Sequence, residues 1–124
     1  MESNTQELTR EQLDAEAKRV AITIFEQLGG VRFLIMVGGE VEYISRNPTT
    51  GNTTLFISFK MFDKADKLAI TYDYGSDTYL FFLIKSGKKP TIYYSQSDVY
   101  CDQLIPLFEE KTGLVASGID IVFV

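Results

Sequence analysis

Residues 68–85 read LAITYDYGSDTYLFFLIK, and this stretch decides the fold class. Residues 68–74 alternate apolar and polar side chains, a period of two that is typical of a half-buried strand. Gly75 and Ser76 form a turn signal. Residues 77–85 are apolar on both faces, so we expect a central strand that is covered on both sides of an antiparallel sheet.

Further strands are expected on both sides of this hairpin. Residues 31–37 are apolar and β-branched, and a Gly-Gly pair follows them as a hairpin signal before a strand at residues 40–46. Residues 47–52, NPTTGN, are predicted to form an exposed polar loop. Strands at residues 54–60 and 91–95 complete an antiparallel meander of about five to six strands.

An amphipathic helix is expected at residues 9–28, ahead of the strands. Thr9 and Gln12 have the spacing of a capping box, and Gly29 and Gly30 supply a left-handed stop. The apolar side chains recur at helical spacing and form one face. They are Leu13, Ala17, Val20, Ala21, Ile24 and Leu28.

A second helix is expected after the strands. Ser95 and Asp98 have the spacing of a second capping box, and Gly113 stands at the C-terminal stop. Pro106 would remove a hydrogen bond inside this helix, at a cost of about 3 kcal/mol, so we expect a kink there. The alternative is a helix that restarts with Pro106 in its first turn. The inner face is expected to carry Cys101, as a small core residue, with Leu104, Ile105 and Phe108.

The order of helix, antiparallel meander and helix predicts an α+β fold in which the helices pack on the sheet. With 124 residues the chain has room for one domain, residues 1–124, with residues 1–8 frayed. Residues 118–124, GIDIVFV, carry strong β-propensity and would invite aggregation if left unpaired. We expect them to add an edge strand, either within the chain or across a homodimer.

The composition argues against catalysis. The chain contains no His and a single Cys, which excludes Ser-His-Asp triads, Cys-His pairs and thiolate metal cages. We therefore expect no enzymatic activity, no metal and no cofactor. The net charge of −5 gives no overall attraction to nucleic acid or anionic lipid. A polar, charged N-terminus and the lack of a long apolar run predict a cytoplasmic protein without a membrane span.

One basic cluster departs from this acidic composition. Lys85, Lys88 and Lys89 surround a predicted turn, and Tyr93 follows closely in the sequence. Basic residues interleaved with aromatic rings are typical of platforms on which single-stranded nucleic acid stacks. The alternative is a solvated hairpin tip without a ligand.

Two pairs of carboxylates are candidates for a shared site. Asp98 and Asp102 are predicted one helical turn apart, where they would either hold a divalent cation or only complement the helix dipole. Asp73 and Asp77 flank the turn at Gly75, where aspartate is also a favoured turn residue. In both pairs we favour the structural role over the two-carboxylate site.

Several short stretches occur together in a suggestive order. They are residues 27–33 with Met36, residues 55–60, residues 70–79, residues 99–104, and Phe108 with residues 112–114. The set spans roughly residues 20–116 and resembles a group of small proteins of unknown function encoded by phages, prophages and other mobile elements. The resemblance implies that genomic setting and, if the protein is phage-encoded, the host cell cytoplasm. It implies no activity and no site residues.

We therefore expect a non-enzymatic phage or mobile-element protein that binds another protein. The most specific version is an inhibitor of a host defence complex, similar to an anti-CRISPR protein, and it depends on the resemblance alone. The alternative is a nucleic-acid-binding accessory factor in phage DNA or RNA metabolism, which would use the basic turn.

Overall fold

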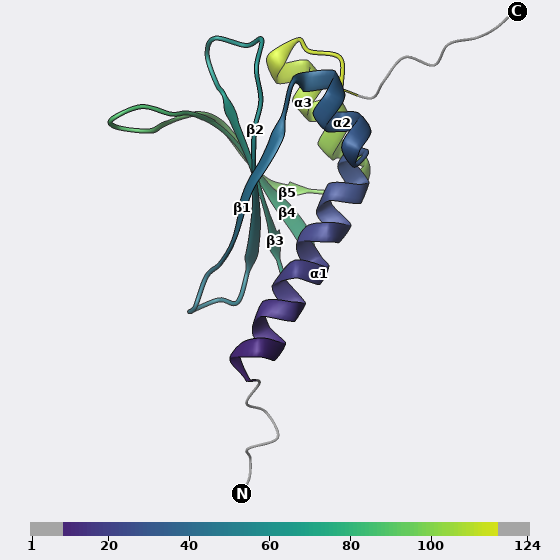
Figure 1. The fold of residues 1–124 in the computed structure, drawn as a ribbon, viewed down its shortest axis with the longest axis vertical. Helices are drawn as coiled ribbons and strands as arrows, with labels where there is room; N and C mark the ends of the chain where they lie inside the picture. Colours follow the sequence, from purple (N-terminus) through teal and green to yellow (C-terminus); the bar gives the residue numbers. More distant parts are fainter. Residues whose placement is uncertain (1–8, 117–124) are drawn as a thin grey trace, which may run out of the picture.

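The computed structural model describes residues 9–116, in which five antiparallel strands form one sheet with three α-helices on the same side of it (Figure 1). The predicted α+β architecture is therefore confirmed. The helices are α1 (Arg10–Leu28), α2 (Val31–Val37) and α3 (Leu104–Thr112), and a 3₁₀ turn, η2 (Cys101–Gln103), precedes α3. The strands are β1 (Glu40–Arg46), β2 (Thr53–Ser58), β3 (Lys67–Asp73), β4 (Thr78–Lys85) and β5 (Thr91–Val99). They follow sequence order across the sheet, so β1 and β5 are its edges.

α1 forms where the amphipathic pattern predicts it. The Thr9 hydroxyl accepts a hydrogen bond from the Gln12 backbone N–H at 3.1 Å, and the Gln12 side chain accepts one from the Thr9 N–H at 2.8 Å. This is the predicted capping box. The helix ends at Gly29, and its buried face packs on the sheet. That face consists of Ala17, Val20, Ala21, Ile24 and Leu28.

Residues 31–37 form the helix α2, so the strand predicted there is wrong. Phe33 and Val37 lie four positions apart and are both buried. Val31 and Ile35 lie on the other side of the helix and are 63% and 74% exposed. Because apolar side chains occupy both sides, the helical period is hidden in the sequence.

The glycine pairs on either side of α2 act as helix boundaries rather than as hairpin turns. Gly30 at the N-cap has a φ of 65° and Gly38 at the C-cap has a φ of 62°, a region that residues with a Cβ rarely adopt. The Gly38 N–H donates to the Leu34 carbonyl and closes the last turn. The chain therefore bends sharply from α1 into α2 and again from α2 into β1.

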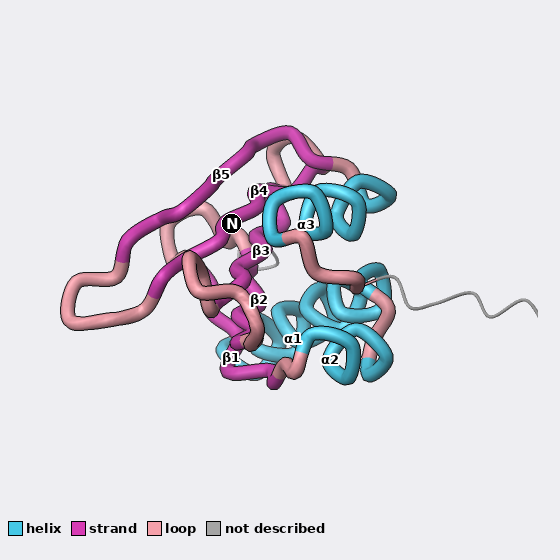
Figure 2. Tube along the Cα trace, turned by 90° about the horizontal axis from the view of Figure 1, so that it is seen from above, coloured by secondary structure: helices cyan, strands magenta, loops and turns pink. Residues whose placement is uncertain are grey.

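β4 lies second from the edge of the sheet, and the helices cover only one of its faces, as Figure 2 shows from above. Its inward side chains are buried, whereas its outward side chains are partly exposed. The inward ones are Tyr79, Phe81 and Leu83, and the outward apolar ones are Leu80, Phe82 and Ile84. Among residues 9–116, the prediction of a central strand covered on both faces is therefore wrong. The described helices cover the inward apolar side chains of β4 and leave the outward ones without a helix above them.

β5 extends to Val99, four residues beyond the end predicted for this strand. The capping box predicted at Ser95 and Asp98 lies inside β5, so no helix begins there. The Tyr100 N–H instead donates to the Gln103 side chain at 2.8 Å, and η2 follows. The second helical segment therefore starts later in the sequence than its pattern indicated.

Pro106 is the third residue of α3, in the first turn, where a backbone N–H has no partner within an α-helix. The expected kink is therefore wrong, and the alternative, Pro106 in the first turn of a helix, is correct. Cys101 is exposed, because it belongs to η2 and not to the buried face of a longer helix. Its predicted role as a core residue is wrong.

Phe108 of α3 lies in the core between the helices and the sheet. Its ring meets the ring of Phe33 in α2 at 5.2 Å and that of Phe59, just beyond β2, at 5.1 Å between centroids, both edge to face. All three side chains are buried. Aromatic pairs in this geometry add about 0.5–1.5 kcal/mol each beyond the burial of their area. One side chain thus ties α2 and α3 to the sheet.

Two predictions concern chain ends that lie outside the described residues. They are the fraying of residues 1–8 and the edge strand, with its homodimer, at residues 118–124. Within residues 9–116 no single helix is long and apolar enough to cross a membrane. α1 and α2 meet at a bend of 58° and pass the same test of length and composition only as a pair.

Two neighbouring residues of β4 offer a matched test of the one-sided core. Phe81→Ala removes a fully buried ring and should lower the free energy of unfolding by about 3–5 kcal/mol. Phe82→Ala removes a partly exposed ring on the opposite face and should cost roughly half as much or less. Chemical denaturation of both variants measures the difference. Equal losses would show that both faces of β4 are covered alike in the isolated protein.

Candidate functional site

The side of the sheet opposite the helices, which we call the open face, carries apolar side chains along its middle. The strand register aligns one outward residue from each strand in a row across the sheet. The row is Tyr43, Phe56, Ala69, Phe82 and Ser95. Within it, the Tyr43 and Phe56 rings are stacked, with centroids 4.4 Å apart and planes at 19°. The open face therefore presents aromatic side chains on both sides of Ala69, which is itself buried.

The surroundings of this row are mixed. On β4 and β5, Ile84 pairs with Ile92, which is 61% exposed. On β1 and β3, Lys67 and Glu42 form an ion pair of 2.9 Å, and the hydrogen bond to Glu42 raises the pKa of Lys67. In an antiparallel sheet with one solvated face, the outward positions are usually polar. The outward side chains of the open face are apolar in the row from Tyr43 to Phe82, unlike this pattern, and charged at the Glu42–Lys67 pair, as the pattern predicts.

The residues predicted to bind nucleic acid lie on the β4–β5 hairpin, which projects from the body of the molecule (Figure 1). Lys85 ends β4, Lys88 and Lys89 lie in the turn, and all three are exposed. Tyr93 is 43% exposed and meets Phe62 edge to face, with ring centroids 5.4 Å apart. The structure thus places the four residues on one hairpin, with Tyr93 against the connector between β2 and β3.

Neither carboxylate pair forms a two-carboxylate site. Asp98 belongs to β5 and Asp102 to η2, so they are not one helical turn apart as predicted. Asp73 accepts hydrogen bonds from the Gly75 N–H at 3.0 Å and the Ser76 hydroxyl at 3.1 Å, which is the turn role that we favoured. No group of three or more His, Cys, Asp or Glu side chains within residues 9–116 is placed to hold a metal ion.

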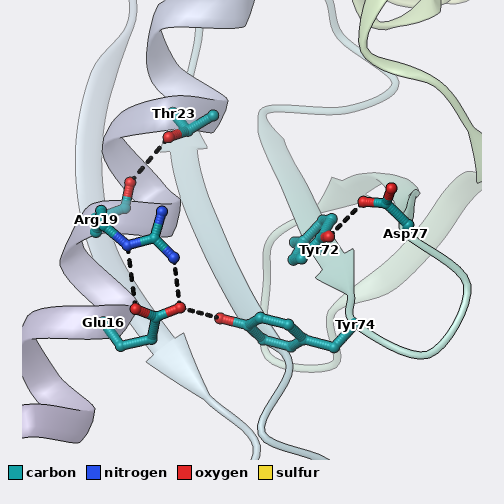
Figure 3. Close-up of polar contacts among 6 residues, drawn as sticks. All are labelled: Glu16, Arg19, Thr23, Tyr72, Tyr74 and Asp77. Carbon is teal, nitrogen blue, oxygen red and sulfur yellow. Dashed lines mark hydrogen bonds and ion pairs between the residues drawn. The ribbon is translucent and has the colours of Figure 1, made fainter.

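A polar cleft that the sequence did not reveal lies between α1 and the hairpin of β3 and β4 (Figure 3). Its volume is about 290 Å³. We call it the tyrosine cleft, because three tyrosines of this hairpin line it. The lining residues are Arg19, Val20, Thr23, Gln27, Tyr72, Tyr74, Asp77 and Tyr79.

Two of the tyrosine hydroxyls have acceptors in the lining itself. Tyr72 donates to the Asp77 carboxylate, and this hydrogen bond stabilises the protonated phenol and raises the pKa of Tyr72 to about 12. Tyr79 donates to the side-chain oxygen of Gln27 on α1, and burial raises the pKa of Tyr79. Both phenols are therefore protonated at neutral pH.

The third hydroxyl crosses from the hairpin to the helix. Tyr74 donates to Glu16 Oε2 at 3.3 Å (Figure 3). The same carboxylate accepts hydrogen bonds from Arg19 Nε at 3.1 Å and Nη2 at 2.5 Å, and the Arg19 hydrogen bonds lower the pKa of Glu16. Glu16 and Arg19 thus form a two-point ion pair within one turn of α1, and their charges largely cancel.

Sequence reasoning missed this cleft because its residues are far apart along the chain. Gln27 and Tyr79 are separated by 52 positions, and Glu16 and Tyr74 by 58. They meet only because α1 packs next to the hairpin of β3 and β4 in the folded protein. The one local signal, the alternation around Tyr72, predicted a half-buried strand and carried no information on a site.

Comparisons of the chain with models of protein families, with curated proteins and with solved structures each found no match. The class that the structure defines is an α+β protein with helices on one face of an antiparallel five-stranded sheet. The resemblance to proteins of phages and mobile elements stays a prediction.

The pKa of Tyr72 tests the geometry of the tyrosine cleft. This phenol should titrate near pH 12, above the value of 10.0 for an ordinary tyrosine. Because the folded pKa is the higher one, the hydrogen bond to Asp77 stabilises the fold below pH 10, and this contribution is lost as the pH rises toward 12. Asp77→Asn should return the pKa of Tyr72 toward 10, because a neutral amide favours the protonated phenol less.

The measurement is an alkaline titration followed by the ultraviolet absorbance of tyrosinate. A Tyr72→Phe variant identifies the step that belongs to Tyr72. An Asp77→Asn variant whose titration matches that of the unaltered protein would contradict the contact.

Proposed function

We propose that this protein acts by binding another protein, and that the open face of its sheet is the binding surface. The observation that supports the proposal is the outward apolar side of β4, around Phe82, which no segment among residues 9–116 covers. Tyr43, Phe56 and Ile92 extend this surface over the neighbouring strands.

Burial of these side chains under a partner is favourable, at about 25 cal/mol for each Å² of apolar area removed from water. Aromatic side chains near the centre of an interface commonly carry most of the binding energy. The stacked pair of Tyr43 and Phe56, with Phe82 in the same row, supplies such a centre. The Glu42–Lys67 pair supplies a polar border, as interfaces of this kind have.

The edge of β5, which pairs with no other strand among residues 9–116, adds a second means of attachment beside the open face. β5 is a nine-residue edge strand, TIYYSQSDV, whose one charged residue is Asp98. Natural edge strands usually discourage pairing through lysine, proline, a short length or β-bulges. β5 has no Lys or Pro, but register shifts against β4 interrupt it on both sides of residues 94–96, so these residues are its regular stretch. A strand of the partner that pairs with β5 would extend the sheet and place its side chains next to the open face.

The most specific version of the proposal is that the partner is a host defence complex, which the protein inhibits as an anti-CRISPR protein does. The support for this version is the resemblance to proteins of phages and mobile elements. A chain with no His and one Cys, which lacks the common catalytic sets, is compatible with action by binding alone.

Nucleic-acid binding by the β4–β5 hairpin is a second candidate function. Six of the twelve Lys and Arg residues of the chain lie between positions 60 and 89, in or beside the β2–β3 connector and this hairpin, at one end of the sheet. They are Lys60, Lys64, Lys67, Lys85, Lys88 and Lys89. Glu42 pairs with Lys67, and Asp63 and Asp66 lie in the same connector, so the positive charge left at that end is carried mainly by the exposed Lys85, Lys88 and Lys89. In a protein with a net charge of −5, this local positive charge favours a polyanion at the hairpin.

Two charges on the open face should strongly weaken partner binding. Tyr43→Glu and Ile92→Glu change side chains that are 51% and 61% exposed, so the double variant should keep its fold. Loss of anchors of an interface costs about 2 kcal/mol or more, which corresponds to a roughly 30-fold weaker complex. Affinity capture from host lysate, with and without nuclease treatment and with the variant beside the unaltered protein, measures the loss.

Ile35→Glu is the matched control, because Ile35 is 74% exposed and belongs to the helical side. It should capture the same partner as the unaltered protein. Retained capture by the double variant, or equal loss in the control, would contradict the assignment of the open face. Capture that disappears only after nuclease treatment would favour the second candidate.

The hairpin lysines give that second candidate its own test. Changing Lys85, Lys88 and Lys89 to Glu should abolish shifts of single-stranded oligonucleotides in gel electrophoresis. Three lost phosphate contacts should lower the slope of log affinity against log salt by about 2. An unaltered protein that binds no oligonucleotide at low salt would exclude this function.

A further inference from the structure

We propose that the tyrosine cleft binds an organic cation, an alkylammonium or guanidinium group, between the tyrosine rings and the Asp77 carboxylate. The proposal does not depend on the open face, because the cleft lies between α1 and the β3–β4 hairpin, on the helical side of the sheet (Figure 3).

The hydrogen-bonding state of the cleft favours a ligand that donates. The hydroxyls of Tyr72, Tyr74 and Tyr79 all donate to acceptors of the protein. The Thr23 hydroxyl is also used, since it donates to the Arg19 carbonyl at 3.1 Å. Because their protons are used, these hydroxyl groups can only accept further hydrogen bonds, through the lone pairs of their oxygens. A ligand that donates several N–H groups is therefore complementary to the cleft.

The charge of the cleft has the sign that a cation requires. Arg19 is held by two hydrogen bonds to Glu16, so this pair contributes little net charge. Asp77 then remains as the uncompensated charge of the lining, with one oxygen accepting from Tyr72. An anion would meet this carboxylate beside an Arg19 guanidinium whose charge Glu16 already balances.

The rings supply the second element of cation recognition. Tyr72 meets Tyr74 with centroids 4.8 Å apart and Tyr79 with centroids 5.6 Å apart, so the three rings form one cluster. The face of an aromatic ring carries negative electrostatic potential, and ammonium and guanidinium groups bind against it. The combination of clustered rings and a carboxylate is the chemistry that recognises such groups.

The size of the cleft limits the ligand. About 290 Å³ lies at the lower end of the range for small-molecule sites, so it holds one cationic head group with a short alkyl chain. The source of that group is a free small amine or the side chain of a lysine or arginine on a partner. Both sources present the same chemistry to the cleft.

The test is a titration of the full-length, isotopically labelled protein, followed by nuclear magnetic resonance. Butylammonium and methylguanidinium are the probes, and acetate is the anionic control. Both cations should give saturable shifts at Tyr72, Tyr74, Asp77 and Tyr79, and acetate should give none there. A short blocked peptide with one lysine presents the same cation on a side chain, and its acetylated form, which lacks the charge, is its control. If the peptide binds more tightly than butylammonium, the source is a side chain of a partner, and if butylammonium binds more tightly, it is a free amine.

Matched variants separate specific binding from general attraction to an acidic protein. Asp77→Asn should weaken binding of the cations roughly two- to fivefold, whereas Asp63→Asn, in the connector at the other end of the sheet, should not change it. Asn suits position 77, where φ is 57°. Tyr74→Leu should weaken binding roughly two- to fivefold, and Tyr74→Phe should retain it.

Three results would overturn the proposal. They are the absence of saturable shifts with either cation, equal weakening by Asp77→Asn and Asp63→Asn, and tighter binding of acetate than of the cations at the same residues. Thermal melts of each variant show whether the fold is kept, and a variant that does not fold is replaced by Tyr72→Phe. This variant keeps the ring and frees the Asp77 oxygen that accepted from Tyr72, so it should bind the cations at least as tightly, and weaker binding would contradict the proposal.

Discussion

Phe108 contacts Phe33 of α2 and Phe59 beyond β2, and through these contacts α2 and α3 are fixed to one face of the sheet. α1 covers the rest of that face with its apolar stripe. Because all the described helices are used on one side, the other side of the sheet has no cover among residues 9–116. Both the open face and the tyrosine cleft follow from this one-sided burial.

The two surfaces differ in kind. The open face is broad, apolar at its centre and built from residues aligned by strand register, so it suits a macromolecular partner. The tyrosine cleft is small, polar and formed where α1 packs next to the hairpin of β3 and β4, so it suits one chemical group. They lie on opposite sides of the sheet and can be altered independently.

Much of the fold was predictable, because α1, β3 and the turns around them have strong local patterns. The Thr9 capping box and the turn at Asp73 form as expected. α2 was missed because its apolar side chains occupy both sides of a short helix, and the start of α3 because β5 continues through the supposed cap at Ser95. The hairpin lysines could be placed from sequence, but the cleft could not, since its residues meet only through the packing of α1.

The central claim is that the outward side of β4 is partly exposed in the free protein and covered in its complex. Hydroxyl-radical footprinting of the protein alone and of its captured complex measures this directly. Phe82 and Tyr43 should be oxidised in the free protein and protected in the complex, while the buried Phe81 should be protected in both. Phe82 and Tyr43 that are protected in the free protein, or oxidised equally in the complex, would contradict the account.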